Sequence, residues 1–365
     1  MLVKRKYKCA DVAVWGKPPP PYGGISVHIS RLIPVLQKSN VSFQLYNLTL
    51  PQTNHKFVKD YSNKILLWFL KLYIGRSEKV HYLFTVKTSV RFFAVLFGLI
   101  RKRKIILSIH GASLHKSVLS GSVINRLMAK ISVRYADVVI GVNTDICEMA
   151  IKLGANPTKV YHIPAFIPPQ DTDIQPQYHL RDFLKNNTPK IVITGFLNSR
   201  AERDTYGLWR TLVVFSLFTK EYPDTRLIVV LQNNVSLNSP LILDYIKEIE
   251  KYKLSSHIML HMSNNELWPI LKMADLFIRP SESDGDAVSI REAVQFGVPV
   301  IASDCVKRLE VVETFTTGNN NSFLHALKKV VANLNKYRIF TKEYRLEDNS
   351  EKIINVIINQ LSEKY

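Results

Sequence analysis

The chain has 365 residues, 46% apolar and 22% charged, so it is long enough for two domains that each bury a substantial core. Its three cysteines are scattered and odd in number, which argues against a disulfide framework or a zinc site and indicates a reducing compartment. The formal net charge of +19 lies wholly in residues 1–168, which carry 25 Lys and Arg against 6 Asp and Glu, while residues 169–365 are neutral. This asymmetry predicts two domains with different partners, one of them polyanionic or an anionic membrane surface.

The N-terminus does not have the pattern of a secretory leader. The apolar run that follows its Lys and Arg residues is short, contains Asp11 and leads into a Pro-rich loop. Two further apolar runs, at 65–74 and 92–100, are shorter than the roughly 20 residues needed to cross a bilayer. We therefore expect a cytoplasmic protein.

The first half alternates between strand and helix patterns. Buried strands are predicted at residues 8–15, 41–48, 80–85, 105–108 and 136–143. An amphipathic helix begins close to Gly23 and Gly24, and His110 directly follows the fourth strand. Doubly wound folds place ligand groups at this carboxyl end of their strands, although a single His is more often structural.

Two segments of this basic half combine aromatic and apolar residues with cations. They are residues 64–73 and 91–104, and the second ends in four consecutive cations, Arg101, Lys102, Arg103 and Lys104. A helix packed on the sheet explains much of the pattern. Docking of these residues on an anionic lipid surface, or near the acceptor, is the other interpretation.

A Pro-rich stretch separates the halves, and the strand pattern then starts again. We predict a first domain at 1–168, a linker at 169–189, a second domain at 190–344 and a final helical segment at 345–365. The second domain has predicted strands at 190–194, 226–231 and 258–260 and predicted helices at 241–253 and 265–273.

The most informative stretch is residues 279–304, which reads as a strand end, an acidic turn, a helix and a second strand. Asp286 is placed to cap a helix from about 287 to 296, and Gly297 suits its C-terminal stop. The first amides of this helix can hold an anion, while Asp284 and Glu292, eight residues apart, can accept hydrogen bonds from hydroxyls. A nucleotide sugar carries both kinds of group.

This stretch resembles the E-x7-E region of retaining family-four glycosyltransferases with the GT-B fold. Asp284 stands in place of the first Glu and Glu292 is the second, and residues 296–304, FGVPVIASD, match the family's run after the helix. Residues 136–143, ADVVIGVN, are similar to the passage that closes its first domain. The resemblance implies an α/β protein of two Rossmann-like domains facing each other across a cleft, whose last helix crosses back to the first domain.

The resemblance also implies roles for individual residues. Asp284, His110 and Glu292 would form the catalytic set: Asp284 and His110 would contact the donor sugar, and Glu292 the ribose. The full set implied to bind the donor is Gly23, Gly24, Gly195, Arg200, Arg203, Arg279, Gly285, Asp286, Ala287, Val288 and Glu292.

The sequence departs from the family at the two cations that usually hold the donor diphosphate. Phe196 stands where an Arg is usual, and Tyr206 where a Lys is usual. Arg200, Arg203 or Arg279 could supply the missing charge, because a guanidinium suits phosphate.

We therefore expect a retaining hexosyltransferase that moves a sugar from a nucleotide-diphosphate sugar to a hydroxyl of a lipid-linked glycan, in surface polysaccharide biosynthesis at the inner face of the cell membrane. No cofactor, metal or nucleic acid is expected. Asp284-Gly285-Asp286 is literally a D-x-D, a manganese motif in another glycosyltransferase fold, but no His or carboxylate partners surround it. The alternatives are a non-catalytic basic module that binds membrane or polyanions, and a sugar-nucleotide epimerase or phosphorylase with the same fold.

Overall fold

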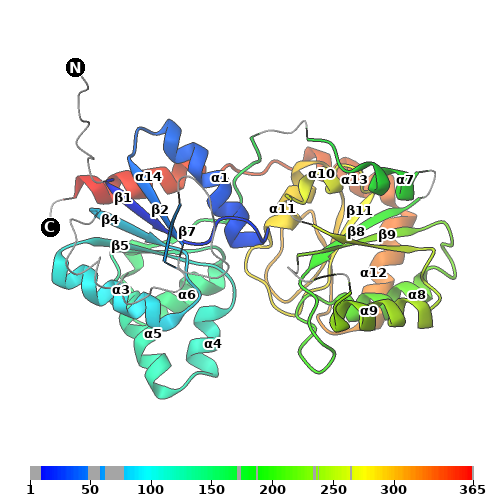
Figure 1. The fold of residues 1–365 in the computed structure, drawn as a ribbon, viewed down its shortest axis with the longest axis horizontal. Helices are drawn as coiled ribbons and strands as arrows, with labels where there is room; N and C mark the ends of the chain where they lie inside the picture. Colours follow the sequence, from blue (N-terminus) through cyan, green and yellow to red (C-terminus); the bar gives the residue numbers. More distant parts are fainter. Residues whose placement is uncertain are drawn as a thin grey trace. The chain divides into compact units, whose positions relative to one another are not determined.

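The computed structural model describes residues 10–47, 58–61, 78–170, 174–185, 188–232, 236, 238–263 and 265–363. The chain divides into two compact units, each built on one parallel sheet (Figure 1). The first unit contains Met1–Pro19, Ile25–Ile167 and Asp348–Tyr365, and the second contains Pro20–Gly24 and Pro168–Glu347. The prediction of two Rossmann-like α/β domains is thus confirmed. The predicted aromatic and basic segment at 64–73 lies outside the described residues.

The first unit has a seven-stranded sheet in the order β3-β2-β1-β4-β5-β6-β7. Its strands are β1 (Val12–Trp15), β2 (Phe43–Asn47), β3 (Val58–Asp60), β4 (Val80–Leu83), β5 (Lys104–Ile109), β6 (Val138–Gly141) and β7 (Val160–His162). Its helices are α1 (Gly24–Lys38), α3 (Thr88–Arg101), α4 (Ser113–Leu119), α5 (Val123–Tyr135), α6 (Thr144–Lys152) and α14 (Ser350–Ser362), with a 3-10 turn at Pro157–Lys159.

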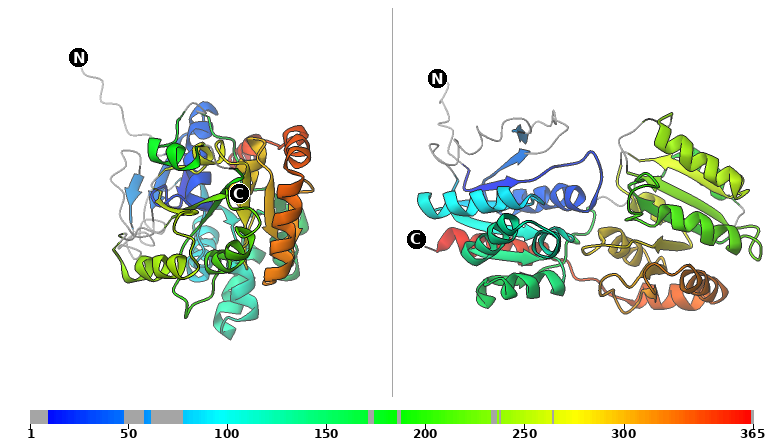
Figure 2. Two further views of the ribbon diagram at one scale, coloured as in Figure 1. Left: turned by 90° about the vertical axis from the view of Figure 1, so that its right-hand side faces the viewer. Right: turned by 90° about the horizontal axis from the view of Figure 1, so that it is seen from below.

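The last helix of the chain, α14, belongs to the first unit, as predicted. Ile353 and Ile357 are buried in the same hydrophobic cluster as Val12 and Val14 of the central strand β1. The red helix lies against this unit in both Figure 1 and Figure 2. The chain therefore leaves the first unit after Ile167 and returns to it at the end.

The second unit has a six-stranded parallel sheet in the order β10-β9-β8-β11-β12-β13. Its strands are β8 (Lys190–Gly195), β9 (Arg226–Leu231), β10 (Ile258–Met262), β11 (Leu276–Arg279), β12 (Val300–Ser303) and β13 (Glu313–Phe315). Its helices are α7 (Tyr178–Leu184), α8 (Leu208–Phe218), α9 (Pro240–Lys251), α10 (Trp268–Leu271), α11 (Val288–Gln295), α12 (Asn320–Ala332) and α13 (Leu334–Glu343).

Both faces of this second sheet are covered, which explains why its central strands contain unbroken apolar runs such as Ile191–Ile193. Ile191 and Ile193 of β8 face one hydrophobic cluster, and Val192 between them faces the other. The stretch treated as a linker contributes to the second cluster, because α7 buries Leu180 and Leu184 there. Helix α10 begins at Trp268, later than the start of the predicted helix at 265–273, because Pro269 is tolerated only in the first turn of a helix.

Candidate functional site

A group of charged residues in the second unit lies at the carboxyl edge of its sheet. β8 ends at Gly195 and β11 at Arg279, and these two strands pair in parallel, so the segments after them meet at one edge. In open α/β sheets this edge is where ligands bind. The acidic turn, defined as residues 281–286 with sequence SESDGD, follows β11 directly.

Asp284, at the centre of the acidic turn, is held by two arginines. Arg279 donates from Nε and Nη2 to the two carboxylate oxygens, both at 3.1 Å, and Arg308 donates from Nη1 at 3.2 Å. Ser281 Oγ donates a fourth hydrogen bond at 3.0 Å. Burial opposes ionisation, but the charges of Arg279 and Arg308 outweigh it and lower the pKa of Asp284 to about 2.

The other two carboxylates of the turn also bind arginines. Glu282 pairs with Arg203 at 2.6 Å and with Arg210 at 3.2 Å, and the hydrogen bond from Arg203 is the main reason why the pKa of Glu282 is lowered. Asp286 accepts two hydrogen bonds from Arg291 Nε, at 2.7 and 2.8 Å.

We call this assembly the arginine cluster. It consists of Arg203, Arg210, Arg279, Arg291 and Arg308 bound to the carboxylates of Glu282, Asp284 and Asp286. Two further carboxylates, Asp204 and Asp304, interact electrostatically with Arg210 and Arg308, so guanidinium groups and carboxylates balance at this edge. Guanidinium groups gathered at one sheet edge still suit the oxygens of a phosphate-bearing ligand.

The two residues at the family's usual cation positions form an aromatic cover over part of this cluster. The rings of Phe196 and Tyr206 lie 5.6 Å apart, and the guanidinium of Arg279 lies 4.9 Å from the centre of the Tyr206 ring. Gly195 is required beneath them, because a Cβ there would come within 2.6 Å of the Tyr206 side chain. Arg279 is thus buried by its aromatic and acidic neighbours rather than open to solvent.

Gly23 and Gly24 belong by their contacts to the second unit, although the sequence analysis assigned them to the first domain. A Cβ on Gly23 would lie 3.7 Å from the Phe196 ring, and one on Gly24 would lie 4.0 Å from Val288. This loop therefore packs beside the aromatic residue that follows β8.

The predicted helix cap at Asp286 is wrong. Helix α11 begins at Val288, and its N-cap residue is Ala287, which makes no side-chain cap hydrogen bond. The carboxylate of Asp286 binds Arg291 instead, and Ala287 adopts φ +34°, a left-handed conformation that L-residues rarely take. The predicted C-terminal stop is confirmed, since Gly297 has φ +70° and follows the last residues of the helix.

Glu292 lies in the middle of α11 and is buried, at 3% exposure. Arg200 is drawn away from the acidic turn, because it pairs with Glu248 of α9 at 2.6 Å and lies 4.7 Å from the centre of the Trp209 ring. Of the three arginines considered for the diphosphate, only Arg203 and Arg279 therefore join the arginine cluster.

In the first unit, His110 follows β5 at the carboxyl edge, as predicted. Its ring lies 5.3 Å from that of His28 and 5.6 Å from that of Phe84, and its Nε2 is 2.9 Å from Ser108 Oγ. Burial holds the pKa of His110 well below its usual value, and electrostatic interactions with His28 and Arg91 lower it further. His110 is therefore neutral at physiological pH.

The four consecutive cations differ in their surroundings. Lys104 opens β5 and is bound by Asp137 at 3.3 Å and Glu363 at 3.0 Å, whereas Arg101 and Lys102 are exposed at the end of α3. Exposed apolar side chains lie close by in the sequence, on α4 and α5, and each is more than half exposed: Leu119, Val123, Ile124 and Leu127. We call these four residues the apolar patch.

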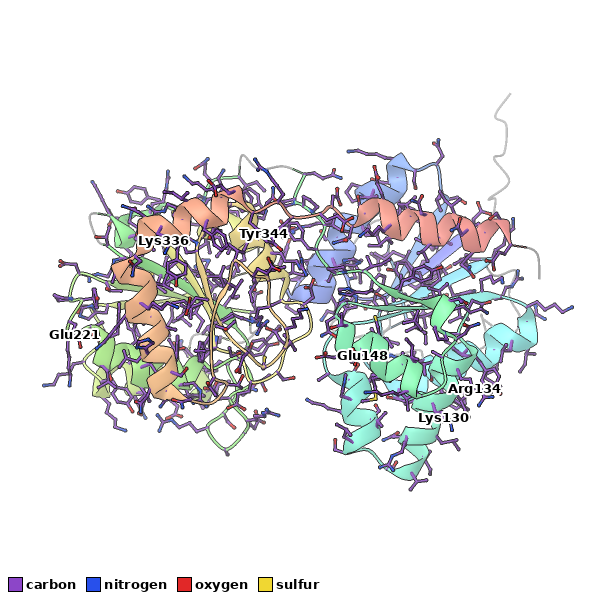
Figure 3. All side chains as sticks on the ribbon, turned by 180° about the vertical axis from the view of Figure 1, so that it is seen from behind. Lys130, Arg134, Glu148, Glu221, Lys336 and Tyr344 are labelled. Carbon is purple, nitrogen blue, oxygen red and sulfur yellow. The ribbon has the colours of Figure 1, made fainter. Side chains whose placement is uncertain are left out.

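Cations accompany the apolar patch. Lys130 and Arg134 of α5 are exposed, and Figure 3 labels both on this helix. Residues 79–136 contain eleven Lys and Arg and no Asp or Glu. No helix among the described residues has the length and apolarity needed to cross a bilayer.

Sequence reasoning missed Arg210 and Arg308. Arg308 lies five residues beyond the end of β12, the strand beside β11, so its position could have been inferred from the sheet edge. Arg210 lies in α8 and its Nη1 also donates to Asn320 Oδ1 at 2.8 Å. No group of three His, Cys, Asp or Glu suited to a metal occurs in the parts of the chain that the structure describes.

Comparison with known proteins agrees with the fold. The family model of glycosyl transferases group 1 matches residues 185–355. Alr3699/HepE from Anabaena, solved in complex with UDP, is 14% identical with a TM-score of 0.66, covering 96% of this chain and 97% of that one. Sucrose-phosphate synthase from Thermosynechococcus elongatus is 14% identical with a TM-score of 0.68, covering 96% and 97%.

A third similar structure is that of S. aureus MnaA with UDP, which is 13% identical with a TM-score of 0.67 and covers 97% of this chain and 99% of that one. At the level of sequence, no curated protein matches the chain. Identities this low establish the fold, while the family model covers most of the second unit. The chain therefore has the GT-B fold, and its residues 185–355 match the family model of glycosyl transferases group 1.

Proposed function

We propose that the protein transfers a sugar, with retention, from a nucleotide-diphosphate sugar to a hydroxyl of a lipid-linked glycan in surface polysaccharide biosynthesis. The arginine cluster carries this proposal, because guanidinium groups gathered at one sheet edge suit the donor diphosphate. Proteins of similar fold, Alr3699/HepE and MnaA, have been solved with UDP, and the former also with UDP-glucose.

Sugar transfer requires that the negative charge developing on the leaving diphosphate be stabilised. In our proposal Arg308 and Arg279 do this, since Asp284 already fixes both guanidinium groups. Asp284 accepts three hydrogen bonds at Oδ2 and one at Oδ1, and its side chain is only 7% exposed. We therefore assign Asp284 a positioning role for the two arginines rather than direct contact with sugar hydroxyls.

Groups that suit the rest of the donor lie beside the cluster. Residues 316–321, with sequence TTGNNN, line an open hollow of about 690 Å³, and Arg210 hydrogen-bonds to two of them, Gly318 and Asn320. Hydroxyl and amide groups of this kind pair with sugar or ribose hydroxyls. Glu292 remains our candidate for the ribose, and His110 for the donor sugar from the first unit.

The membrane part of the proposal rests on the first unit. The apolar patch and the exposed cations Arg101, Lys102 and Lys130 belong to the same unit, and exposed apolar side chains together with cations suit an anionic lipid surface at the inner face of the cell membrane. A lipid-linked acceptor would be reached from such a surface.

We also propose that transfer needs no metal ion, because the guanidinium groups supply the positive charge at the diphosphate. A sugar-nucleotide epimerase or phosphorylase with this fold would use the same cluster, and differs only in the product. A non-catalytic module that binds membranes or polyanions would leave the cluster of the neutral second unit without a role.

The test is to screen nucleotide sugars by thermal shift and then to incubate the best binder with lipid-linked acceptors, with and without EDTA. Transfer that survives EDTA, with the anomeric configuration retained by NMR, is the expected result. Epimerised sugar or a free sugar phosphate as the product would favour the two alternative reactions. Vesicle binding without any nucleotide affinity would refute the proposal.

A further inference from the structure

Arg91, in the first turn of α3, is a buried cation whose partners are all neutral. Arg91 is only 2% exposed. Nε donates to the Thr85 carbonyl at 2.8 Å and Nη2 to Ser113 Oγ at 2.7 Å. The remaining nitrogen, Nη1, is buried and has no hydrogen-bond partner within the described part of the chain.

Within the part of the chain that the structure describes, no carboxylate forms an ion pair with Arg91. The segment from residue 79 to residue 136, which contains β4, α3, β5, α4 and α5, has no Asp or Glu at all. None of the ion pairs found among the described residues includes Arg91, in contrast to the buried Arg279 and Arg308, which share Asp284. Burying a charge without a counter-charge is costly unless a bound group supplies one.

Arg91 also lies where a ligand is expected. Thr85 follows β4, and Ser113 begins α4, three residues after His110, so all three residues lie at the carboxyl edge of adjacent strands. The charge of Arg91 is close enough to lower the pKa of His110. The neighbourhood therefore combines a buried guanidinium with the histidine already assigned to the donor sugar.

A second buried atom without a partner among the described residues belongs to His28, whose ring lies 5.3 Å from that of His110. His28 Nδ1 is 2.6 Å from the Ala165 carbonyl oxygen, which can only accept, so Nδ1 carries the proton and Nε2 is an acceptor. Nε2 is buried and has no partner in the described residues. Burial lowers the pKa of His28 to about 4, so it stays neutral. Arg91 thus offers an unused donor and His28 an unused acceptor among the described residues, and both side chains interact with His110.

We propose that Arg91 binds a phosphate ester of the acceptor substrate, with the acceptor's hydroxyl group on the His28 and His110 side. This proposal rests on the proposed glycosyltransferase function and names the chemical class of its acceptor. The guanidinium can form two charge-assisted hydrogen bonds to phosphate. Neutral oxygen atoms, such as those of Thr85 and Ser113, do not supply the negative charge that a phosphate brings. The competing explanation is that Arg91 only ties the loop after β4 to α4.

The test uses the full chain and two probes, methyl phosphate for the acceptor group and UDP for the donor, each titrated by calorimetry at constant ionic strength. Three variants are compared with the unmodified protein. Arg91→Met removes the charge, Ser113→Ala removes a neutral partner but keeps the charge, and Lys116→Gln removes an exposed cation of the same helix as Ser113.

We expect Arg91→Met to weaken methyl phosphate binding by at least about tenfold. Ser113→Ala and Lys116→Gln should keep most of that affinity, and all three should bind UDP as the unmodified protein does. If Arg91→Met does not fold, Arg91→Lys takes its place, because it keeps the charge but loses the forked geometry, and the same loss is expected.

Three results would overturn the proposal: equal methyl phosphate affinity for the Arg91 variant, an equal loss in Lys116→Gln, or acetate binding as tightly as methyl phosphate. The last would assign a carboxylate instead. Failure of the unmodified protein to bind UDP is a separate result, since it contradicts the proposed function and not the phosphate site.

Discussion

Arg279 and Asp284 form a buried, two-pronged ion pair, in which Nε and Nη2 each donate to a different carboxylate oxygen at 3.1 Å. The side chains are only 10% and 7% exposed. Because Arg308 binds the same carboxylate, one acidic residue orients two cations at the end of β11. The following predictions concern this pair, the helix beside it and the surface of the first unit.

Asp284→Asn should destabilise the second unit by about 3–5 kcal/mol, because it leaves two buried guanidinium groups without their counter-charge. Thermal unfolding compared with the unmodified protein measures this loss. Asp244→Asn is the matched control, since Asp244 is exposed on α9 and should change stability by less than about 0.5 kcal/mol. Equal unfolding temperatures for Asp284→Asn and the unmodified protein would contradict a structural role for the pair.

The same pair predicts how stability depends on pH. The pKa of Asp284 is lowered to about 2 in the folded protein, against about 3.9 in an unfolded chain. Its stabilisation is therefore complete above about pH 4 and is lost as the pH falls through 2. Asp284→Asn should remove only part of the loss of stability at low pH, because the pKa values of Glu248, Glu282 and Asp304 are also lowered in the folded protein.

Arg308→Gln should weaken UDP binding by about 10- to 100-fold, because a charge-assisted hydrogen bond to phosphate contributes roughly 1.5–3 kcal/mol. Arg200→Gln is the control, since Arg200 is bound to Glu248 of α9 and lies outside the arginine cluster. Calorimetric titration with UDP compares the two. A larger loss in Arg200→Gln than in Arg308→Gln would place the diphosphate elsewhere.

Glu292→Gln should lower donor affinity while the protein stays folded, if Glu292 accepts hydrogen bonds from the ribose. The isosteric amide removes the charge without opening a cavity in α11. We expect about a tenfold loss of UDP affinity in calorimetry, and no loss for the control Gln295→Ala, which alters an exposed residue of the same helix. An unchanged affinity would remove Glu292 from the donor site.

Ala287→Gly should raise the stability of the protein. Ala287 has φ +34°, which strains an L-residue by about 1–2 kcal/mol, and glycine relieves the strain at some cost in unfolded-chain entropy. We expect a net gain of about 0.5–1 kcal/mol, seen as a higher unfolding temperature. Ala293→Gly, in the helical interior of α11, should have the opposite effect, of about 1 kcal/mol.

Replacing Val123, Ile124 and Leu127 of the apolar patch by Ser should reduce cosedimentation with anionic vesicles by at least about tenfold. Each side chain that enters the lipid contributes roughly 1.5 kcal/mol or more when fully buried. Arg101→Gln with Lys102→Gln should reduce binding further at low salt, by about 1 kcal/mol per cation.

The control for the vesicle experiment is Leu243→Ser, at an exposed apolar position of α9 in the second unit. It should leave vesicle binding unchanged. Equal cosedimentation of the triple variant and the unmodified protein would refute docking through the apolar patch.

The sequence by itself determined the architecture, because apolar strands that alternate with helices can bury both faces only in doubly wound parallel sheets. It also located His110 at a strand end and the stop at Gly297. These features depend on local pattern: hydrophobic period, a turn residue and the order of elements along the chain. The return of the final helix to the first unit was implied by the family resemblance.

Only the tertiary structure decided which charges meet. Arg203, Arg210 and Arg308 reach the acidic turn from a loop, a helix and another loop, and no local pattern encodes such distant pairings. The same reason explains the error at Asp286, whose carboxylate is an ordinary helix cap in sequence but is bound by Arg291 in the fold. The acidic turn thus reads as a ligand for hydroxyls or a metal, whereas in the folded chain it anchors the arginine cluster.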